Sequence, residues 1–469
     1  MAPIYRGLLF VILLDMKRKV FLRNVGLGVA GLGLPASARP LSLPLSPLPE
    51  STDKSPLNEA YWSAVAAEFE RPTGISINLE NGYFSHSPRR VMQAHREAQE
   101  RINRETSLFM RGEQETAIEE ARKAFAAFQG IDPEQLAFTR NTTESLNIVI
   151  MGYPWKAGDE VVLGNQDYGS MVEAFEQVSH RHGVVLRYAQ VPMHPKSAAE
   201  TAESYLSLIN EMTQMIHLTH LINLSGQIID GESIAKMAKE RNPRIFTVLD
   251  AAHSIAHHTQ TLLEMPSCDA VGGSLHKWLC NPIGVGFLHL KPSAIPLLWP
   301  LMGDTGKPSD DIRRFEHQGT RPIHSLMSLS TAIDFHESIG SQAKKARLHY
   351  LKLCIMGSRK ALGEHYQEPV HGRMIDLTRY AEIDWLCPWE NPEQSGAIVT
   401  VAVKGLTPQQ LAASLKKVGV FTVAIDHPVV KGVRITPHLS NTPADCLALN
   451  AALAELGRSA SIRRRMFDD

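Results

Sequence analysis

Residues 269–287 decide the fold of this chain and read DAVGGSLHKWLCNPIGVGF. Glycines and other small residues surround one lysine, Lys277, and the apolar run 285–290 that follows it predicts a strand. A buried lysine with no neighbouring carboxylate has a lowered pKa, because burial disfavours the charged amine, and this suits it to Schiff-base chemistry. An isolated lysine would instead by default be a surface residue whose stem lies along apolar side chains.

An acid follows a second apolar run further upstream. Residues 246–253 read FTVLDAAH, which places Asp250 at the end of a predicted strand. A carboxylate at that position can keep a pyridinium nitrogen protonated, which makes a pyridoxal ring an electron sink. The alternative is an aspartate that caps a helix N-terminus, and the presence of Lys277 in the next segment makes it the weaker interpretation.

A third segment, residues 136–147, reads LAFTRNTTESLN and runs from a strand pattern into a helix start. Free backbone N–H groups and the hydroxyls of Thr142 and Thr143 would form an anion site there that suits a phosphate. A threonine capping box with Glu144 is the simpler alternative.

The rest of the chain alternates helical patterns with short β-branched runs from about residue 58. This alternation predicts an α/β fold with a mostly parallel sheet, helices on both faces, and ligands beyond the carboxyl ends of the strands. After about residue 341 a long helical pattern and shorter strands predict a smaller α+β domain. Strands are expected at 135–138, 160–163, 184–188, 215–219, 245–249, 285–290, 397–403 and 420–424, and helices at 89–104, 113–128 and 233–240.

In their order and spacing, the three segments around Lys277, Asp250 and Thr142 resemble the fold-type I pyridoxal-phosphate enzymes. The similarity is greatest to the class V aminotransferase family, which includes cysteine desulfurases and isopenicillin N epimerase-like proteins, and it extends from about Tyr61 to the end of the chain. It implies that pyridoxal 5'-phosphate is the cofactor, that Lys277 binds it as a Schiff base, that Asp250 pairs with the ring nitrogen, and that His253 lies near the ring phenolate.

The same resemblance implies further cofactor contacts. Tyr168 falls where the family stacks a ring on the cofactor, and Asn223 falls at a strand end that faces it. Gly319 and Thr320 match a stretch that reaches the phosphate from the partner subunit, which implies a homodimer with shared active sites. The phosphate-contacting positions within the chain are Thr142, Thr143, Ser274 and His276.

Three residues are implied as substrate contacts. Asn81 and Tyr83 resemble the family's N-terminal substrate loop, and Arg434, in the segment GVRITPHLSNT, matches an arginine that clamps an α-carboxylate. A guanidinium binds a carboxylate through two parallel hydrogen bonds, which orients the α-carbon against the ring so that the bond perpendicular to it breaks. The alternative for Arg434 is a surface ion pair.

Composition excludes several other classes of function. The chain has 469 residues, with 48 basic residues against 49 acidic ones, so it presents no basic field for nucleic acid. No apolar run reaches the ~18 residues that span a bilayer. Five scattered cysteines form no Cys-x-x-Cys pair, and the histidine spacings 217/220 and 253/257/258 are not interpreted as a metal site.

The N-terminus is interpreted as an export signal. Residues 16–23 read MKRKVFLR, a Gly-rich segment follows, and Ala36-Ser37-Ala38 ends the pattern. It resembles the twin-arginine signal that carries folded, cofactor-loaded proteins to the periplasm through the export machinery, except that Lys19 stands where the second arginine is usual. The predicted domains are a signal (1–38), a flexible linker (39–57), a large cofactor domain (58–340) and a small C-terminal domain (341–469).

The positions of the cysteines limit the reactions that can be expected. A desulfurase needs a nucleophilic cysteine on a loop shortly before the carboxylate-binding arginine, and residues 423–433 contain none. Transamination, decarboxylation and epimerisation remain. An exported epimerase-like enzyme resembles those of pyoverdine maturation, whose substrate would be a glutamyl side chain modified by oxidative decarboxylation or transamination. The alternatives are an epimerase-like reaction on another amino acid and a cofactor-free binding protein.

Overall fold

The computed structural model describes residues 48, 51–304, 306–367, 372 and 374–468. The predicted export signal, residues 1–38, lies outside the described residues, as does most of the predicted linker. In the part of the chain that is described, no helix combines the length and the apolar character that a membrane crossing requires.

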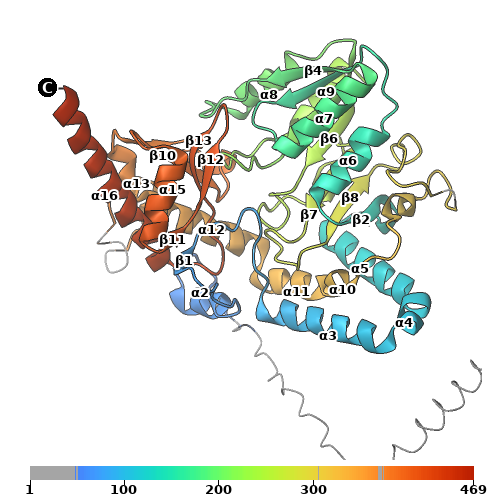
Figure 1. The fold of residues 1–469 in the computed structure, drawn as a ribbon, viewed down its shortest axis with the longest axis horizontal. Coiled ribbons are helices and arrows are strands. Elements are labelled where there is room, and N and C mark those ends of the chain that lie inside the picture. Colours follow the sequence, from blue (N-terminus) through green and yellow to red (C-terminus); the bar gives the residue numbers. More distant parts are fainter. Residues whose placement is uncertain (1–47, 49–50, 305, 368–371, 373, 469) are drawn as a thin grey trace, which may run out of the picture. The chain divides into compact units, whose positions relative to one another are not determined.

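A seven-stranded sheet forms the centre of the larger domain (Figure 1). Its strands lie in the order β2-β8-β7-β6-β5-β3-β4, and only β8 is antiparallel to its neighbours. This arrangement confirms the predicted α/β fold with a mostly parallel sheet. The strands are β2 (Leu136–Thr139), β3 (Glu160–Gly164), β4 (Val185–Ala189), β5 (Thr213–Thr219), β6 (Phe246–Asp250), β7 (Ala270–Ser274) and β8 (Gly286–Leu290).

Helices cover both faces of this sheet, because successive residues of a strand point to opposite sides. Val162 of β3 packs in a hydrophobic cluster with α5, α8 and α9, whereas Val161 and Leu163 pack in another with α6 and α7. The helices of this domain are α3 (Arg89–Glu105), α4 (Ser107–Gly112), α5 (Gln114–Gln129), α6 (Thr142–Gly152), α7 (Gly169–His182), α8 (Ala198–Leu206), α9 (Gly231–Arg241), α10 (His324–Met327) and α11 (Leu329–Ile339).

Strand β7 was not among the predicted strands, because its sequence AVGGS lacks a β-branched pattern. Gly272 and Gly273 in this strand allow its neighbours to pack closely against it. A Cβ on Gly272 would lie 2.7 Å from the side chain of Leu146 in α6, and one on Gly273 would lie 2.3 Å from the ring of Phe287 in β8. The two glycines therefore let α6 and β8 approach the strand that leads to Lys277.

The C-terminal part forms a second hydrophobic core around an antiparallel sheet of order β12-β13-β10-β9. The predicted strand 420–424 is two strands, and β9 and β13 were not predicted. N-terminal strand β1 pairs in parallel with β11. Helix α2 (Glu59–Ala66) packs in the hydrophobic cluster of the larger domain. The other elements are β1 (Ile77–Asn78), α12 (Ser341–Met356), α13 (Arg359–Leu362), β9 (Ile383–Trp385), β10 (Val399–Val403), α15 (Pro408–Lys417), β11 (Val420–Phe421), β12 (Val423–Asp426), β13 (Lys431–Ile435) and α16 (Pro443–Asp468).

Residues 51–57 belong to the folded body, although the sequence predicted them to be linker. The ammonium of Lys54 donates to the carbonyl of Ser338 at 2.7 Å. The guanidinium of Arg347 donates to the carbonyl of Pro56, also at 2.7 Å. Proline-rich composition removes backbone donors but leaves carbonyl acceptors, and these tie the segment down.

The carboxyl ends of the central strands meet at one edge of the sheet. Thr219 of β5 lies opposite Asp250 of β6, which lies opposite Gly272 of β7. Helix α6 begins at Thr142, shortly after β2 ends. This edge is where parallel sheets bind their ligands.

Candidate active site

A cavity of about 240 Å³ lies at this edge of the sheet. It brings together residues that the sequence placed in one site although they are spread along the chain. The predicted residues that line it are Tyr83, Thr142, Thr143, Tyr168, Asn223, Asp250, His253, Ser274, His276, Lys277 and Arg434. The lining residues that were not predicted are Gly82, Phe84, Asn141, Met171, Thr219, Ala252 and Ile283. Most of these are chain neighbours of predicted residues, and Thr219 ends a predicted strand.

Lys277 follows β7 and faces the imidazole of His253, with Nζ and Nε2 separated by 3.0 Å. On the other side of the ring, Trp278 donates from Nε1 to Nδ1 of His253 at 3.2 Å. Burial lowers the pKa of Lys277 to about 8, although Asp250 opposes this shift. The lowered pKa agrees with the value expected of a lysine that forms Schiff bases.

Asp250 ends β6 and is 3% exposed. Its carboxylate accepts a hydrogen bond from the backbone N–H of Ala252 at 2.8 Å, so it caps the turn after the strand rather than a helix. Burial raises the pKa of Asp250, whereas His217, the Ala252 N–H and Lys277 act in the opposite direction. His217 is itself held 2.8 Å from the carboxylate of Asp167, in a fully buried pair.

The N-terminus of α6 opens into the cavity. Its N-cap is Asn141, whose side chain accepts from the Glu144 N–H at 2.9 Å, so the threonine capping box is not formed. The hydroxyl of Thr142 therefore stays in the cavity, 2.6 Å from the hydroxyl of Ser274, which also accepts from the Thr142 N–H at 2.9 Å. Burial lowers the pKa of nearby His276 to about 4, so its imidazole is neutral.

Arg434 of β13 reaches the cavity from the smaller domain and forms a buried ion pair that the sequence did not predict. Its Nη2 lies 2.5 Å from Oε1 of Glu80, and the two side chains are only 8% and 7% exposed. Nη1 donates to the carbonyl of Asn223 at 3.3 Å. Arg434 is therefore not a surface residue, and its guanidinium already has an acidic partner within the protein.

Three predicted residues do not line this cavity. Asn81 is fully buried, and its Nδ2 donates to the carbonyl of Thr436 at 2.9 Å, so it holds the loop in place instead of facing a substrate. Gly319 and Thr320 lie in an exposed loop elsewhere on the chain. Their contact with a partner subunit's phosphate stays a prediction.

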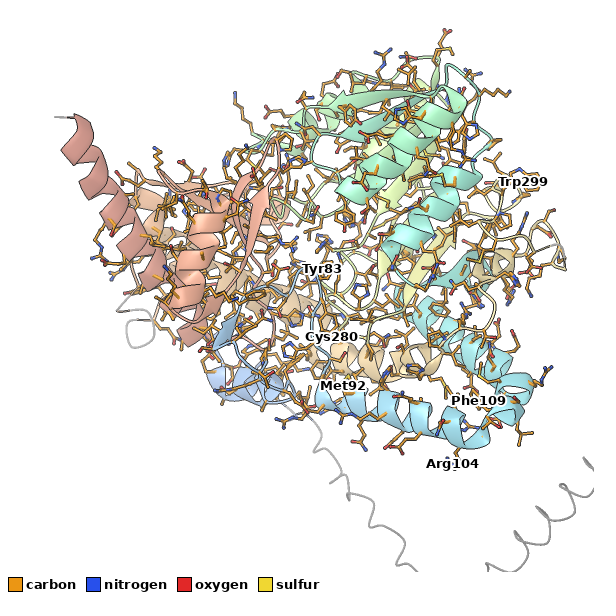
Figure 2. The ribbon with its side chains drawn as sticks, viewed as in Figure 1. Tyr83, Met92, Arg104, Phe109, Cys280 and Trp299 are labelled. Atoms are coloured by element: carbon orange, nitrogen blue, oxygen red, sulfur yellow. The ribbon has the colours of Figure 1, made fainter. Side chains whose placement is uncertain are left out.

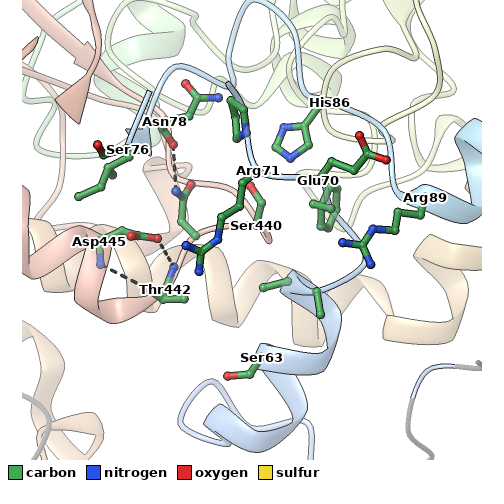
Figure 3. A pocket seen from close by; sticks show the side chains of 16 residues that line it. Ser63, Glu70, Arg71, Ser76, Asn78, His86, Arg89, Ser440, Thr442 and Asp445 are labelled. Atoms are coloured by element: carbon green, nitrogen blue, oxygen red, sulfur yellow. Dashed lines mark hydrogen bonds between the residues drawn. The ribbon is translucent and has the colours of Figure 1, made fainter. Parts of the chain in front are cut away.

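A larger cavity of about 870 Å³ lies beside α2 and the start of α16 (Figure 3). None of the predicted cofactor residues lines it. It shares the segment around residues 77–86 with the first cavity: Asn78 and His86 line the larger one, and Tyr83 lines the smaller. Tyr83, labelled in Figure 2, is 75% exposed.

All five cysteines are buried thiols: Cys268, Cys280, Cys354, Cys387 and Cys446. Burial raises the pKa of each, for Cys280 and Cys387 to about 11. Within the described ranges, no three His, Cys, Asp or Glu side chains gather as metal ligands would.

The residues present suit pyridoxal phosphate. Hydroxyls and N–H groups at the start of α6 can receive the phosphate, and the carboxylate of Asp250 can receive a ring N–H. The side-chain carbonyl of Asn223 and Nδ1 of His276 are buried without a partner among the described residues, and both residues line the cavity. Lys277 supplies the amine.

Comparison with known proteins agrees with this geometry. A model of the family described as aminotransferase class-V matches residues 77–429, more than half of the chain. An isopenicillin N epimerase of Streptomyces clavuligerus is 30% identical over 287 residues, covering 58% of this chain and 71% of the relative.

Solved structures agree as well. The apo structure of a cysteine desulfurase from Thermococcus onnurineus superposes with a TM-score of 0.67 at 24% identity, covering 82% of this chain and 95% of that one. A C-DES mutant with glycine covalently linked to its PLP cofactor gives a TM-score of 0.65 at 18% identity, covering 82% and 97%. The chain therefore belongs to the aminotransferase class-V family and is a fold-type I enzyme that uses pyridoxal phosphate.

Proposed function

We propose that this enzyme acts at the α-carbon of an amino-acid moiety. The observation that carries the proposal is that Lys277, Asp250 and Arg434 line one cavity. Pyridoxal phosphate, when bound, withdraws electrons from the bonds at the α-carbon of a substrate amine. The cavity thus combines a lysine for the amine chemistry, a carboxylate for the ring nitrogen and a guanidinium for the substrate carboxylate.

Each of these residues has a separate task in the proposal. Lys277, with a pKa lowered to about 8, can give up and take back a proton near neutral pH. Asp250 would keep a proton on the ring nitrogen of the bound cofactor, and His253, beside Lys277, would lie near the ring. Arg434 turns the α-carbon so that the bond to be broken stands perpendicular to the ring.

The phosphate would be held by Thr142, Thr143, Ser274 and His276, and Tyr168 would lie on the ring. Helix α6 presents its positive N-terminal end to the same place. We propose a homodimer in which Gly319 and Thr320 complete the phosphate site of the partner. Mixing a Lys277→Ala chain with a Thr320→Ala chain tests this, because only shared sites would leave one intact and one doubly impaired site per mixed dimer.

Sulfur mobilisation is the least supported reaction, although several relatives, in sequence and in structure, are cysteine desulfurases. Attack on sulfur needs a thiolate, and burial raises the pKa of all five thiols. Cys280 follows Lys277 by three residues, but it does not line the cavity; its thiol is buried 3.5 Å from His438, and its pKa is raised to about 11. The epimerase relative and the missing thiolate favour transamination, decarboxylation or epimerisation.

We further propose that the substrate is the glutamyl side chain of a pyoverdine-type siderophore precursor in the periplasm. The export-like sequence at residues 16–38 supports this location. Tyr83 and Ile283 are exposed at the cavity, by 75% and 63%, and offer apolar surface for a substrate larger than a free amino acid. An epimerase-like reaction on another amino acid is the second candidate, favoured by the identity to isopenicillin N epimerase.

Three experiments test these proposals. Purified protein should be yellow with bound cofactor and should change its absorbance with an amino-acid substrate, and Lys277→Ala should lose the absorbance band of the Schiff base between Lys277 and the cofactor. Side-chain masses of siderophores secreted by a deletion strain test the substrate, and unchanged masses would refute it. Cell fractionation tests the location, with Arg18→Ala expected to retain the protein in the cytoplasm.

A further inference from the structure

The ion pair of Glu80 and Arg434 places a carboxylate of the protein on the guanidinium that the proposed function reserves for the substrate. Oε1 of Glu80 lies 2.5 Å from Nη2 of Arg434, and both side chains are buried. Oε1 also accepts from the backbone N–H of Tyr83 at 3.0 Å. Oε2 of Glu80 and Nε of Arg434 are buried without a hydrogen-bond partner among the described residues. Each side chain of the ion pair therefore keeps one polar atom that could bind a ligand.

The backbone holds Glu80 firmly beside the arginine. Glu80 forms a parallel bridge with Thr436, and the hydroxyl of Thr436 accepts from the N–H groups of Asn81 and Gly82 at 2.7 and 3.0 Å. A Cβ on Gly82 would lie 3.3 Å from the guanidinium of Arg434, so glycine allows the chain to pass against it. Glu80 is therefore a fixed part of the arginine's surroundings.

A second carboxylate must share this guanidinium with Glu80 or displace it. A buried arginine with one acidic partner is already neutralised, and a further acid meets like-charge repulsion at close range. A substrate carboxylate therefore gains less binding free energy from Arg434, because it must either replace the contact with Glu80 or bind beside it against the repulsion of the two negative charges.

We propose that Glu80 is a specificity residue that competes with substrate carboxylates for Arg434. This proposal rests on the proposed function, in which Arg434 anchors the α-carboxylate. It predicts weak binding of small amino acids whose carboxylate is their main anchor. The favoured substrates are larger amino compounds that gain further contact area on the exposed side chains of Tyr83 and Ile283.

The test measures binding to the cofactor-loaded enzyme by calorimetry and by cofactor absorbance. The probes are L-glutamate, propylamine, which is an amine without a carboxylate, and propionate, a carboxylate without an amine. Glu80→Gln should tighten glutamate and propionate by about tenfold and leave propylamine unchanged, since only a carboxylate gains from the freed arginine. An unchanged or weaker affinity for both carboxylates would overturn the proposal and would show that Glu80 only positions Arg434.

Control variants make the result specific. Glu160→Gln removes another buried glutamate that pairs with an arginine, Arg187 at 2.7 Å, at the opposite ends of the strands, and it should change no affinity. Adding Arg434→Gln to Glu80→Gln should abolish the gain. If Glu80→Gln does not fold, as thermal melting would show, Glu80→Asp shortens the side chain and should tighten the carboxylates in the same direction.

The outcomes also separate this inference from the proposed function. If no amine alters the cofactor absorbance but propionate binds more tightly to Glu80→Gln, the proposed function fails and the competition stands. If glutamate alters the absorbance of wild type and variant with equal affinity, the proposed function stands and the competition is refuted.

Discussion

The indole Nε1 of Trp278 donates to Nδ1 of His253 at 3.2 Å, while Nε2 of the same ring lies 3.0 Å from Nζ of Lys277. An indole N–H can only donate, so a neutral His253 must carry its proton on Nε2 and point it at the lysine. That contact is a hydrogen bond only when Lys277 is an uncharged amine. Burial lowers the pKa of His253 well below its usual value and that of Lys277 to about 8, in agreement with this arrangement.

Trp278→Phe should raise the pKa of Lys277 by about one unit, or ~1.4 kcal/mol. Without the indole donor, His253 can move its proton to Nδ1 and offer Nε2 as an acceptor to a charged lysine. Because only the neutral amine captures pyridoxal phosphate, the rising limb of the capture rate against pH should move to higher pH. Trp299→Phe, at an exposed position, is the control. A profile that stays in place or moves to lower pH would contradict this.

Ser274→Ala should weaken pyridoxal phosphate binding by about tenfold, the equivalent of one or two hydrogen bonds. The Ser274 hydroxyl lies 2.6 Å from that of Thr142 at the N-terminus of α6, where the phosphate is expected. Pyridoxal, which lacks the phosphate, serves as the control ligand. Equal losses for the two ligands in equilibrium titrations would place the phosphate elsewhere.

Gly82→Ala should weaken the binding of carboxylate substrates by about tenfold and leave cofactor affinity unchanged. The new Cβ would lie 3.0 Å from the methyl of Thr436 and 3.3 Å from the guanidinium of Arg434, so the arginine must shift. Gly112→Ala, where a Cβ meets no atom within 4 Å, is the matched control. Substrate titrations in which both variants behave like wild type would remove Arg434 from the substrate site.

Lys352→Met should change how stability depends on pH. Lys352 is fully buried, donates to Ser395 Oγ at 2.9 Å and to the Gly396 carbonyl at 3.1 Å, and burial lowers its pKa to about 8. Between that pH and the unfolded pKa of about 10.4, the unfolded chain binds more protons, so the free energy of unfolding rises with pH by about 3 kcal/mol from this group. Below about pH 8, Lys352 is charged in the folded protein, and its burial destabilises the fold in full. This destabilisation is lost as the pH rises and the buried amine gives up its proton.

Urea unfolding of wild type and variant at about pH 7 and about pH 9.5 measures this effect. The lost hydrogen bonds affect the variant equally at both pH values, so the difference between them isolates the charge. Wild type should gain more stability than Lys352→Met on going to the higher pH. Equal gains would mean that Lys352 is not destabilised by burial.

The sequence predicted the central sheet and most of the cavity because both depend on local patterns in a known order. Apolar runs mark the strands, and Asp250, Thr142 and Lys277 follow strands whose carboxyl ends must meet. Strand β7 was not predicted, because its glycines allow close packing against α6 and β8 and leave no pattern of β-branched residues in the sequence.

Contacts between distant segments could not be predicted. The pairing of Glu80 with Arg434 joins positions 354 residues apart, and no periodicity links them. Asn81 was expected to face a substrate because its segment resembled a family loop. Its amide instead hydrogen-bonds Thr436, whose position depends on how β13 packs against the N-terminal segment. That Asn141 and not a threonine caps α6 could not be predicted either, because asparagine and threonine are both good capping residues.

We propose that Lys277 is the lysine that binds pyridoxal phosphate. A lowered pKa does not by itself single out Lys277, because burial also lowers the pKa values of Lys344 and Lys352 to about 8. It is the one of these three that lines the cavity with Asp250 and His253. The most direct measurement is borohydride reduction of the cofactor-loaded enzyme followed by mass spectrometry of its peptides. The reduced cofactor should be found on Lys277; its absence, or its attachment to Lys344 or Lys352, would contradict the account.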